Sequence, residues 1–365
     1  MKLALIASLA APVMICCAST LGQITIDGTL DGDYGNPKAA QVVHTGFGNA
    51  TDGVNSYANG SELDSAYVKI DVANGFLYVF MAGNLESNFN KLDIFIDSVP
   101  GEGQNELRSD NADIDYNGLN KMGRDDVNGY AGLKFDEGFA ADFCLMTTLG
   151  GDPVTQYANI AQVLTSGGGV GAYIGSGIFS DPTGVNLLDD QVYGCQLSIN
   201  NSNAGGVSGD SADPGSGCGV LTGIEMKIPL VLLAWDGSSD IKVCAFINGN
   251  GHDYVSNQVL GSLPISSGNL GGDGIGGYLG GFPGALRGVD FAAIPGDQYF
   301  SAFGPDACGF CFGDLDGSGE VDSGDVGIVL LDTGPCAGCP TDLDGSGEVD
   351  SGDVGLTLLS SGPCQ

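Results

Sequence analysis

Residues 66–82 read AYVKIDVANGFLYVFMA, and this stretch decides the fold of the larger part of the chain. Its two halves, 66–72 and 76–82, are short and rich in aromatic and β-branched residues, as the packed strands of a β-sandwich are. The dipeptide Asn74-Gly75 between them is a strong signal for a β-hairpin turn. We therefore expect two neighbouring antiparallel strands here.

The same pattern extends in both directions from this hairpin. Short apolar runs separated by Gly, Asn, Asp and Ser continue through the chain, with further strand candidates at 91–97, 223–228 and 241–247. Sustained helical periodicity is absent, and several short strands with turn signals indicate an antiparallel β-sandwich. The predicted fold is mainly β: a large sandwich body at 23–303, followed by a small module of loops and helices at 304–365.

The composition limits the partners that the protein can have. The chain has 365 residues, of which 42% are hydrophobic, too apolar for a disordered acidic polymer. Its 45 Asp and Glu against 11 Lys and Arg give a net charge of −34, and this charge repels nucleic acid and anionic lipid surfaces. It suits divalent cations instead. The 63 Gly and 14 Pro favour turns over helices.

Residues 1–22 read as a secretory signal peptide. Lys2 supplies the positive charge, an apolar run follows at 3–18, and small residues offer a cleavage site at the end. The run is shorter than the roughly 20 apolar residues of a membrane span. Lipid attachment at Cys16 or Cys17 is disfavoured because the residues just before them are not small. We therefore expect a secreted or cell-surface protein without a transmembrane segment in the mature chain.

The end of the chain is an acidic internal repeat. Residues 311–365 hold eleven acidic residues and no Lys or Arg. The sequence DLDGSGEVDSGDVG occurs at 314–327 and again at 342–355, an offset of 28 residues (342 − 314). Such a repeat indicates two copies of one supersecondary unit, and we place the units at 311–336 and 339–364.

Each copy carries the oxygen ligands of a twelve-residue EF-hand loop. Positions 1, 3, 5, 9 and 12 supply side-chain oxygens, Gly at position 6 allows the sharp turn, and position 7 supplies its backbone carbonyl. The predicted ligands are Asp314, Asp316, Ser318, Glu320, Asp322 and Asp325 in the first loop and Asp342, Asp344, Ser346, Glu348, Asp350 and Asp353 in the second. We expect two calcium ions, one per loop. A solvated acidic turn without metal is the alternative, and the two identical copies argue against it.

One short helix follows each loop. Ser323 is the expected cap of the first helix, Val326, Val329 and Leu330 form an apolar stripe along it, and Gly334 ends it. The second copy repeats this scheme. Too few residues precede each loop for an entering helix, so the unit is loop–helix.

Paired loop–helix repeats with Asp at position 12 resemble type I dockerin modules, and their Cys-flanked form is similar to repeats of exported planctomycete-type bacterial proteins. The resemblance implies a cohesin-type scaffold protein as partner. In that family, loop positions 10 and 11 carry recognition, and the matching residues here are Ser323, Gly324, Ser351 and Gly352. Gly stands at position 11, where the family usually has a hydroxyl residue.

The cysteines of an exported chain are expected to form disulfides. Removing the signal peptide leaves nine of the 11 Cys. Two bonds would close the repeats, Cys311–Cys336 and Cys339–Cys364. We further expect Cys308 to be the odd thiol and Cys195 to pair with Cys218, whereas the partners of Cys144 and Cys244 stay open. With two His in the chain, the Cys-x-x-Cys spacings favour disulfides over zinc.

The body resembles family 9-like carbohydrate-binding sandwiches. The resemblance is carried by IDGTLD at 26–31, DIFID at 93–97 and a strand that ends in Ile228-Pro229. It implies a β-sandwich that binds polysaccharide and does not imply catalysis. Sugar binding uses exposed aromatic rings, and the sequence leaves the choice open: Trp235 is expected in the core, and the alternatives are Tyr34, Tyr67, Tyr116 and Tyr130.

We predict no catalytic residue. His44 and His252 are isolated, and neither GxSxG nor HExxH occurs. One acidic cluster has two interpretations, a solvated loop or a third calcium site: Asp93, Asp97, Glu102, Asp110, Asp113 and Asp115. The sequence favours an exported non-catalytic attachment protein. The alternatives are a dockerin-borne glycoside hydrolase, whose two carboxylates need no motif, and a structural cell-surface protein.

Overall fold

The computed structural model describes residues 24–47, 60–180, 187–203, 205–207, 217–264, 267–308, 313–315, 320–336, 339, 341–343 and 346–363. The signal peptide predicted at 1–22 lies outside these residues. Among the described residues, no helix is both long enough and apolar enough to cross a membrane.

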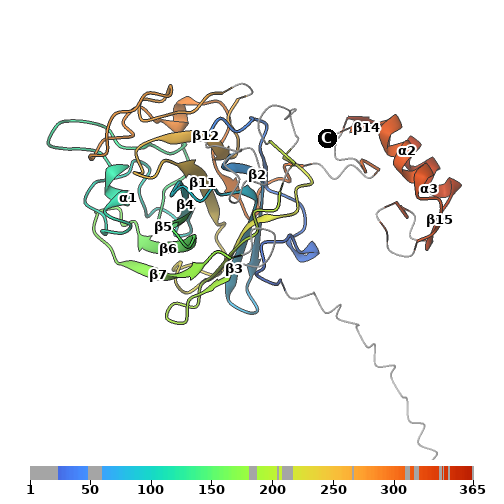
Figure 1. Cartoon of the computed structure of the whole chain (residues 1–365), viewed down its shortest axis with the longest axis horizontal. Helices are drawn as coiled ribbons and strands as arrows, with labels where there is room; N and C mark the ends of the chain where they lie inside the picture. The colour runs from blue at the N-terminus through green and yellow to red at the C-terminus, as the bar shows by residue number, and fades with distance from the viewer. Residues whose placement is uncertain are drawn as a thin grey trace, which may run out of the picture.

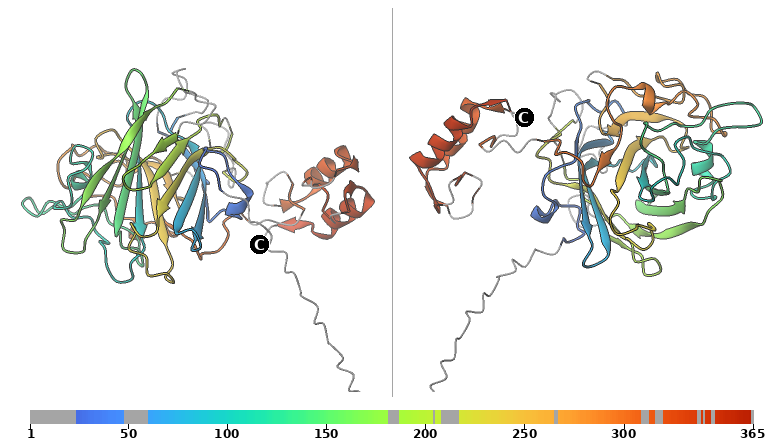
Figure 2. Two further views of the ribbon diagram at one scale, coloured as in Figure 1. Left: turned by 90° about the horizontal axis from the view of Figure 1, so that it is seen from below. Right: turned by 180° about the vertical axis from the view of Figure 1, so that it is seen from behind.

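The body is a β-sandwich of two antiparallel sheets (Figures 1 and 2). The first sheet, in spatial order, contains β1 (Ala39–Ala40), β2 (Glu62–Asp71), β3 (Phe76–Asn84), β10 (Gly223–Pro229), β9 (Gln196–Ile199) and β8 (Leu187–Asp189). The second contains β12 (Val255–Leu260), β11 (Lys242–Asn248), β4 (Lys91–Asp97), β5 (Phe143–Gly150), β6 (Thr155–Gln162) and β7 (Gly171–Ile178), with β13 (Phe300–Ser301) beside β11. Short helical turns are η1 (Gly32–Tyr34), α1 (Gly118–Lys121) and η3 (Phe291–Ala293). The predicted mainly β fold is confirmed.

The hairpin on which the fold prediction rested is the β2–β3 pair. The two strands pair from Glu62 opposite Asn84 to Asp71 opposite Phe76. Gly75 has φ 79°, a left-handed conformation that Gly adopts without a steric penalty, and its N–H donates to the carbonyl of Asp71 at 2.8 Å. The other predicted strands are β4, β10 and β11. All five strand predictions are confirmed.

Apolar side chains lie on both faces of the sheets, which explains why the strands read as continuous apolar runs. Leu77 of β3 and Ile94 of β4 belong to the main core. On the outer face of the second sheet, Phe95 and Phe246 pack under loops, and on the outer face of the first sheet Phe80 packs under the N-terminal segment. With both faces covered, neither sheet needs polar side chains at every second position.

A buried carboxylate fastens the N-terminal segment to the first sheet. Glu225 of β10 accepts the N–H groups of Asp27 and Gly28 at 2.8 and 2.9 Å, and the hydroxyl of Tyr34 donates to it at 2.9 Å. Burial raises the pKa of Glu225 to about 7, although these three hydrogen bonds lower it. The opening motif IDGTLD thus has a structural role, because it attaches the N-terminal segment to the first sheet.

The C-terminal module is built from two short helices, α2 (Ser323–Leu331) and α3 (Ser351–Leu359), which contact each other (Figure 1). Its strands pair across the repeats. The loop strand β14 (Glu320–Val321) pairs with β17 (Gly362–Pro363) after the second helix, and β15 (Gly334–Pro335) after the first helix pairs with β16 (Glu348–Val349). Each repeat therefore completes the other.

The predicted disulfides are wrong. Cys336 bonds to Cys339, with the Cα atoms 5.7 Å apart, and because a cysteine forms one disulfide, neither can bond to Cys311 or Cys364. Those two lie outside the described residues. A Cα separation of 5.7 Å lies within the ordinary range for a disulfide.

Cys308 is not the odd thiol. It bonds to Cys218, with the Cα atoms 6.0 Å apart, and so ties the end of the body to a loop 90 residues earlier. Cys195 therefore has no bond to Cys218. Among the described cysteines, Cys144, Cys195 and Cys244 are buried free thiols.

Replacing Leu77 by Ala should lower the free energy of unfolding by about 2–5 kcal/mol, because it leaves a cavity between the two sheets. The matched control is Leu221→Ala, which truncates an exposed leucine and should change stability by less than about 0.5 kcal/mol. Urea unfolding followed by Trp fluorescence measures both. Equal effects of the two changes would contradict the assignment of the core.

Candidate calcium centres in the C-terminal module

A carboxylate caps each helix of the module. Asp322 precedes α2 and accepts the N–H of Gly324 at 2.6 Å. Asp325, in the first turn, accepts the N–H of Asp322 at 2.8 Å, and the two form a reciprocal capping box. Ser323, the expected cap, is instead the first helical residue. The predicted cap lies one residue after the observed cap, because the Asp322 carboxylate accepts a free N–H group at the helix start.

The second copy has the same geometry. Asp350 accepts the N–H of Gly352 at 2.6 Å, and Asp353 accepts the N–H of Asp350 at 2.8 Å. A capping box is present again. The starts of the two helices thus have the same geometry, which supports treating the two segments as one repeated unit.

The carboxylate at loop position 12 closes each loop. Asp325 accepts the N–H of Leu315 at 2.6 Å, and Asp353 accepts the N–H of Leu343 at 2.7 Å. Both carboxylates are fully buried. Each therefore ties the beginning of its loop, at position 2, to the first turn of the helix, and brings the ligands at the two ends of the loop together.

An unpartnered oxygen lies in the second loop. Asp342, at position 1, accepts the N–H of Gly347 through Oδ2 at 2.8 Å. Its Oδ1 is buried and has no hydrogen-bond partner. A buried carboxylate oxygen without a donor is destabilising, and calcium coordinates such oxygens. The residues therefore fit a calcium ion at this loop.

In the second loop, the residue at position 7 is oriented as in an EF-hand-type loop, with its side chain outside and its carbonyl towards the loop. The side chain of Glu348 is exposed, whereas its carbonyl accepts the hydroxyl of Ser346, at position 5, at 2.9 Å. The carbonyl thus faces the loop. The side chain of Glu348 should not bind the ion.

Not every predicted ligand can be placed. Asp316, Ser318 and Asp344 lie outside the described residues, as does the side chain of Glu320. Asp314 opens the first loop and is half-buried, like Asp342 in the second.

The predicted partner-binding residues lie on the surface. Ser323, Gly324, Ser351 and Gly352 are all exposed at the starts of the two helices. Of the expected apolar stripe on α2, Val329 is buried but Leu330 is exposed, because the contact between the helices is narrow. Four leucines of the two helices lie on the surface, each more than half exposed: Leu330, Leu331, Leu358 and Leu359.

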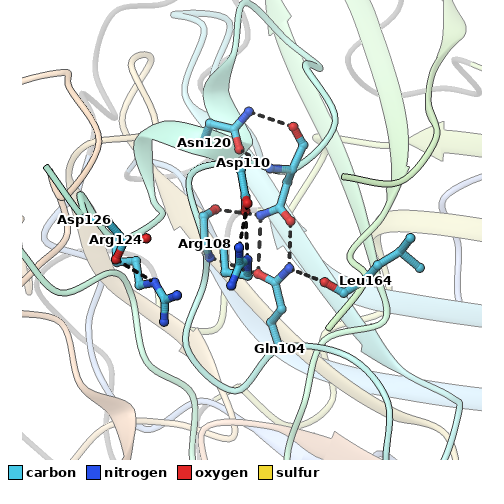
Figure 3. Close-up of polar contacts among 8 residues, drawn as sticks. Gln104, Arg108, Asp110, Asn120, Arg124, Asp126 and Leu164 are labelled. Atoms are coloured by element: carbon cyan, nitrogen blue, oxygen red, sulfur yellow. Dashed lines mark hydrogen bonds and ion pairs between the residues drawn. The ribbon is translucent and has the colours of Figure 1, made fainter. Parts of the chain in front are cut away.

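In the body, the acidic cluster is divided among separate partners. Asp110 pairs with Arg108, Nη2 to Oδ2 at 2.6 Å (Figure 3), and Asp115 pairs with Lys91 at 2.9 Å. Gln104 and Asn120 support this segment through amide hydrogen bonds (Figure 3). Asp110 and Asp115 thus have different basic partners, whereas Asp93 and Asp115 share a contact with His252.

The structure separates the aromatic candidates. Tyr34 and Tyr67 are buried, and Trp235 packs against the core with its Nε1–H donating to the carbonyl of Ser239 at 2.7 Å. Tyr116 and Tyr130 are exposed, Tyr116 by 92%. Two further exposed rings, Tyr278 and Phe282, have no sequence signal that distinguishes them from core aromatics.

Two loop regions that carry exposed rings contact each other. Gly284 donates to the carbonyl of Gly123 at 2.6 Å, and the guanidinium carbon of Arg287 lies 3.9 Å from the ring centre of Tyr130. Tyr278 donates to Asp253 at 3.2 Å. We call the exposed rings of Tyr116, Tyr130, Tyr278 and Phe282 the aromatic end.

A buried ion network includes Asp115, the residue directly before Tyr116. His252 lies 2.7 Å from Asp115 through Nε2 and 3.2 Å from Asp93 through Nδ1. Burial opposes a charged imidazole, but the two carboxylates outweigh burial and raise the pKa of His252. Asp115, Tyr116 and Asn117 all have positive φ, 45°, 55° and 63°, a strained backbone of the kind found at binding sites.

A second body feature is an open cleft of about 720 Å³. Its charged lining comprises the carboxylates of Asp97, Glu102, Glu137 and Asp240 and the amines of Lys134 and Lys242. Burial raises the pKa of Asp97. Two members of the predicted acidic cluster, Asp97 and Glu102, therefore line a shared surface depression.

Comparison with known proteins supplies no relative: no family model, curated protein or solved structure matches the chain.

Asp353→Asn should remove one bound calcium equivalent from the full chain, and Asp325→Asn should do the same, because each change removes the charge of a buried ligand. The affinity of the altered loop should fall at least roughly 100-fold, since changes to groups outside the ligand shell already cost 10–100-fold. Glu348→Gln is the matched control and should keep every equivalent. Calorimetric titration measures all three. A loss of calcium in Glu348→Gln but not in Asp353→Asn would contradict the EF-hand-type assignment.

Proposed function

We propose that this is an exported, non-catalytic attachment protein: its C-terminal module binds two calcium ions and docks onto a cohesin-type scaffold protein, and its body holds a polysaccharide. The observation that carries the calcium proposal is the buried, unpartnered Oδ1 of Asp342 in a loop already closed by Asp353. The N-terminal segment supports export, to the cell surface or the medium.

Calcium would supply the positive charge that the module lacks. The eleven carboxylates at 311–365 face no Lys or Arg of their own segment, so repulsion opposes folding of the loops without a cation. Asp325 and Asp353, at position 12, order the loops and bind the ion together with the acids at positions 1, 3 and 9. The helices follow from the ordered loops. Ser at position 5 and Asp at position 12 should give each loop a weaker affinity for calcium, and a weak affinity is sufficient outside the cell.

The exposed starts of the two helices support docking. Ser323 and Ser351 occupy equivalent positions in a module whose repeats complete each other. Surface leucines such as Leu331 and Leu359, both more than four-fifths exposed, extend the same helices. Exposed apolar side chains of this kind mark protein-binding surfaces. Without calcium the helices would lose their capped starts, and docking would be lost.

Binding of the full chain to an immobilised type I cohesin should require millimolar calcium and should disappear in EGTA. The double variant Ser323→Arg/Ser351→Arg should bind at least about tenfold more weakly, since a cost of 1.4 kcal/mol is tenfold; both repeats are changed because either could face the partner. Ser361→Arg alters an exposed serine of the same module and should bind normally. Surface plasmon resonance measures all of these. Binding that persists in EGTA, or no binding at all, contradicts docking.

The aromatic end supports polysaccharide binding by the body. Sugar rings stack on exposed aromatic faces, and the His252 contact holds Asp115, the residue directly before Tyr116. The ring of Tyr130 packs against Arg287. Ordering of this kind lowers the entropy lost on binding, and exposed rings from separate loops give an extended polysaccharide several stacking positions.

Tyr116→Ala and Tyr278→Ala should each weaken polysaccharide binding about three- to tenfold, as the loss of one stacking contact of roughly 0.5–1.5 kcal/mol implies. Tyr193→Ala, an exposed tyrosine between β8 and β9, is the control and should bind normally. Affinity electrophoresis on a panel of polysaccharides measures binding.

A glycoside hydrolase remains the rival function, favoured by the carboxylates that line the cleft. Hydrolysis of any polysaccharide in that panel, abolished by Asp240→Asn or Glu137→Gln, would replace the non-catalytic proposal.

A further inference from the structure

A second group of buried carboxylates lies in the body, at the end of the β2–β3 hairpin. Glu62 is directly opposite Asn84 in the register. The register shifts between Leu63 and Ser65, which makes Asp64 the extra residue of a β-bulge, a feature that re-aims side chains. Leu63 belongs to the core between the sheets, and both acids are fully buried.

Amide groups gather around these two acids. The side-chain N–H groups of Asn84 and Asn203 both donate to Glu62 Oε1 at 2.7 Å. Asn203 also donates to Asp64 Oδ2 at 2.9 Å. One amide thus bridges the two carboxylates, which must lie side by side.

The loop at 205–207 closes over the site. The N–H of Val207 donates to Asp64 Oδ1 at 2.7 Å. A Cβ on Gly206 would lie 1.9 Å from that same oxygen, so only Gly allows the backbone to approach so closely. The loop therefore shields the site from water. All of the described polar side chains of the site are acids or amides.

Two oxygens of this cluster have no partner. Glu62 Oε2 and Asn84 Oδ1 are buried without a hydrogen bond. They belong to two side chains that are joined by a 2.7 Å hydrogen bond between their other terminal atoms. Both atoms are acceptors as the side chains are placed, so the partner of each must be a hydrogen-bond donor or a cation. A positive charge could satisfy both acceptors and also compensate the charge of the buried acids.

No basic side chain supplies that charge. Among the described residues, the ion pairs of Lys, Arg and His involve neither Glu62 nor Asp64. Burial, and for Glu62 the neighbouring Asp64, raise the pKa of Glu62 to about 9 and that of Asp64 to about 7. Without a bound cation, the surroundings of Glu62 and Asp64 therefore disfavour the charged form of both carboxyl groups.

We infer that Glu62, Asp64 and Asn84 form a binding site for a divalent cation, Ca²⁺, inside the sandwich body. The donors are all oxygens, the set that calcium selects, and the cation neutralises both acids. Among the described residues, no group of three or more His, Cys, Asp or Glu side chains could hold a metal ion, so the site that we infer needs an amide oxygen beside its two carboxylates. The inference does not depend on calcium binding by the C-terminal module.

The competing explanation is a proton. A neutral Glu62 could donate from Oε2 to Asn84 Oδ1 and complete an acid–amide pair. The substitution Glu62→Gln separates the two, because a glutamine amide reproduces the neutral acid: its Nε2–H₂ replaces the proton, and its oxygen keeps the hydrogen bonds to Asn84 and Asn203. Under the proton explanation the variant keeps or gains stability, and under the cation explanation it loses a charged ligand.

The only Trp of the chain makes the test specific to the body. Trp235 lies in the body, and residues 309–365 contain no Trp or Tyr, so fluorescence excited at 295 nm follows unfolding of the sandwich alone. In the full chain, calcium at about 100 times Kd should raise this unfolding midpoint by about 5 °C relative to EGTA. Glu62→Gln should abolish the shift and remove one bound calcium equivalent by calorimetry.

Two variants serve as controls. Asp71→Asn changes a carboxylate at the far end of β2 and should keep the calcium-induced shift. Asp353→Asn, in the C-terminal loop, should also keep the Trp-detected shift while losing its own calcium equivalent, which separates this inference from the proposed docking function. If Glu62→Gln does not fold, Asn84→Asp tests the same site and should enlarge the shift by adding a charged ligand.

The unaltered chain alone can overturn the inference. A Trp-detected midpoint that is the same in calcium and in EGTA would show that no cation binds the body, and a Glu62→Gln variant that keeps both the shift and the calcium equivalent would show that any cation binds elsewhere.

Discussion

The backbone N–H group donating to a buried carboxylate is the interaction on which this structure depends. With 45 acidic and 11 basic side chains, ion pairs can satisfy only a minority of the acids. Glu225 fastens the N-terminal segment through two N–H groups, and Asp353 closes a loop through two more. Such hydrogen bonds lower the cost of burying a charge.

Where too few N–H donors surround a buried carboxylate, one of its oxygens has no hydrogen-bond partner. Asp342 in the module and Glu62 in the body each keep one buried, unpartnered oxygen. In a protein with abundant Lys and Arg, a basic side chain could fill either position. Here we propose a cation from solution as the complement at both positions, and the same shortage of positive charge would then link the C-terminal module and the sandwich.

Much of the fold could be predicted because its signals are local. The β2–β3 hairpin follows from Asn74-Gly75 and the runs beside it, and the two short helices follow from the repeated sequence. The calcium ligands, inferred from spacing within twelve residues, stay a prediction. The predictions that failed concern choices between neighbours. The cap of α2 moved from Ser323 to Asp322, and Cys336 bonded to Cys339 instead of a distant cysteine, because small changes in chain direction decide which group is within reach.

By itself, the sequence determined the β-rich body, the repeated acidic loops and the excess of negative charge, since each is a property of composition or of short-range spacing. Only the tertiary structure decided which tyrosines are exposed and which acids are buried together. Tyr67 and Tyr116 are the same residue type, yet one packs under the N-terminal segment and the other projects from a loop. Asn203 joins Glu62 across 141 residues; burial and long-range contact depend on how distant segments pack, and no local pattern records them.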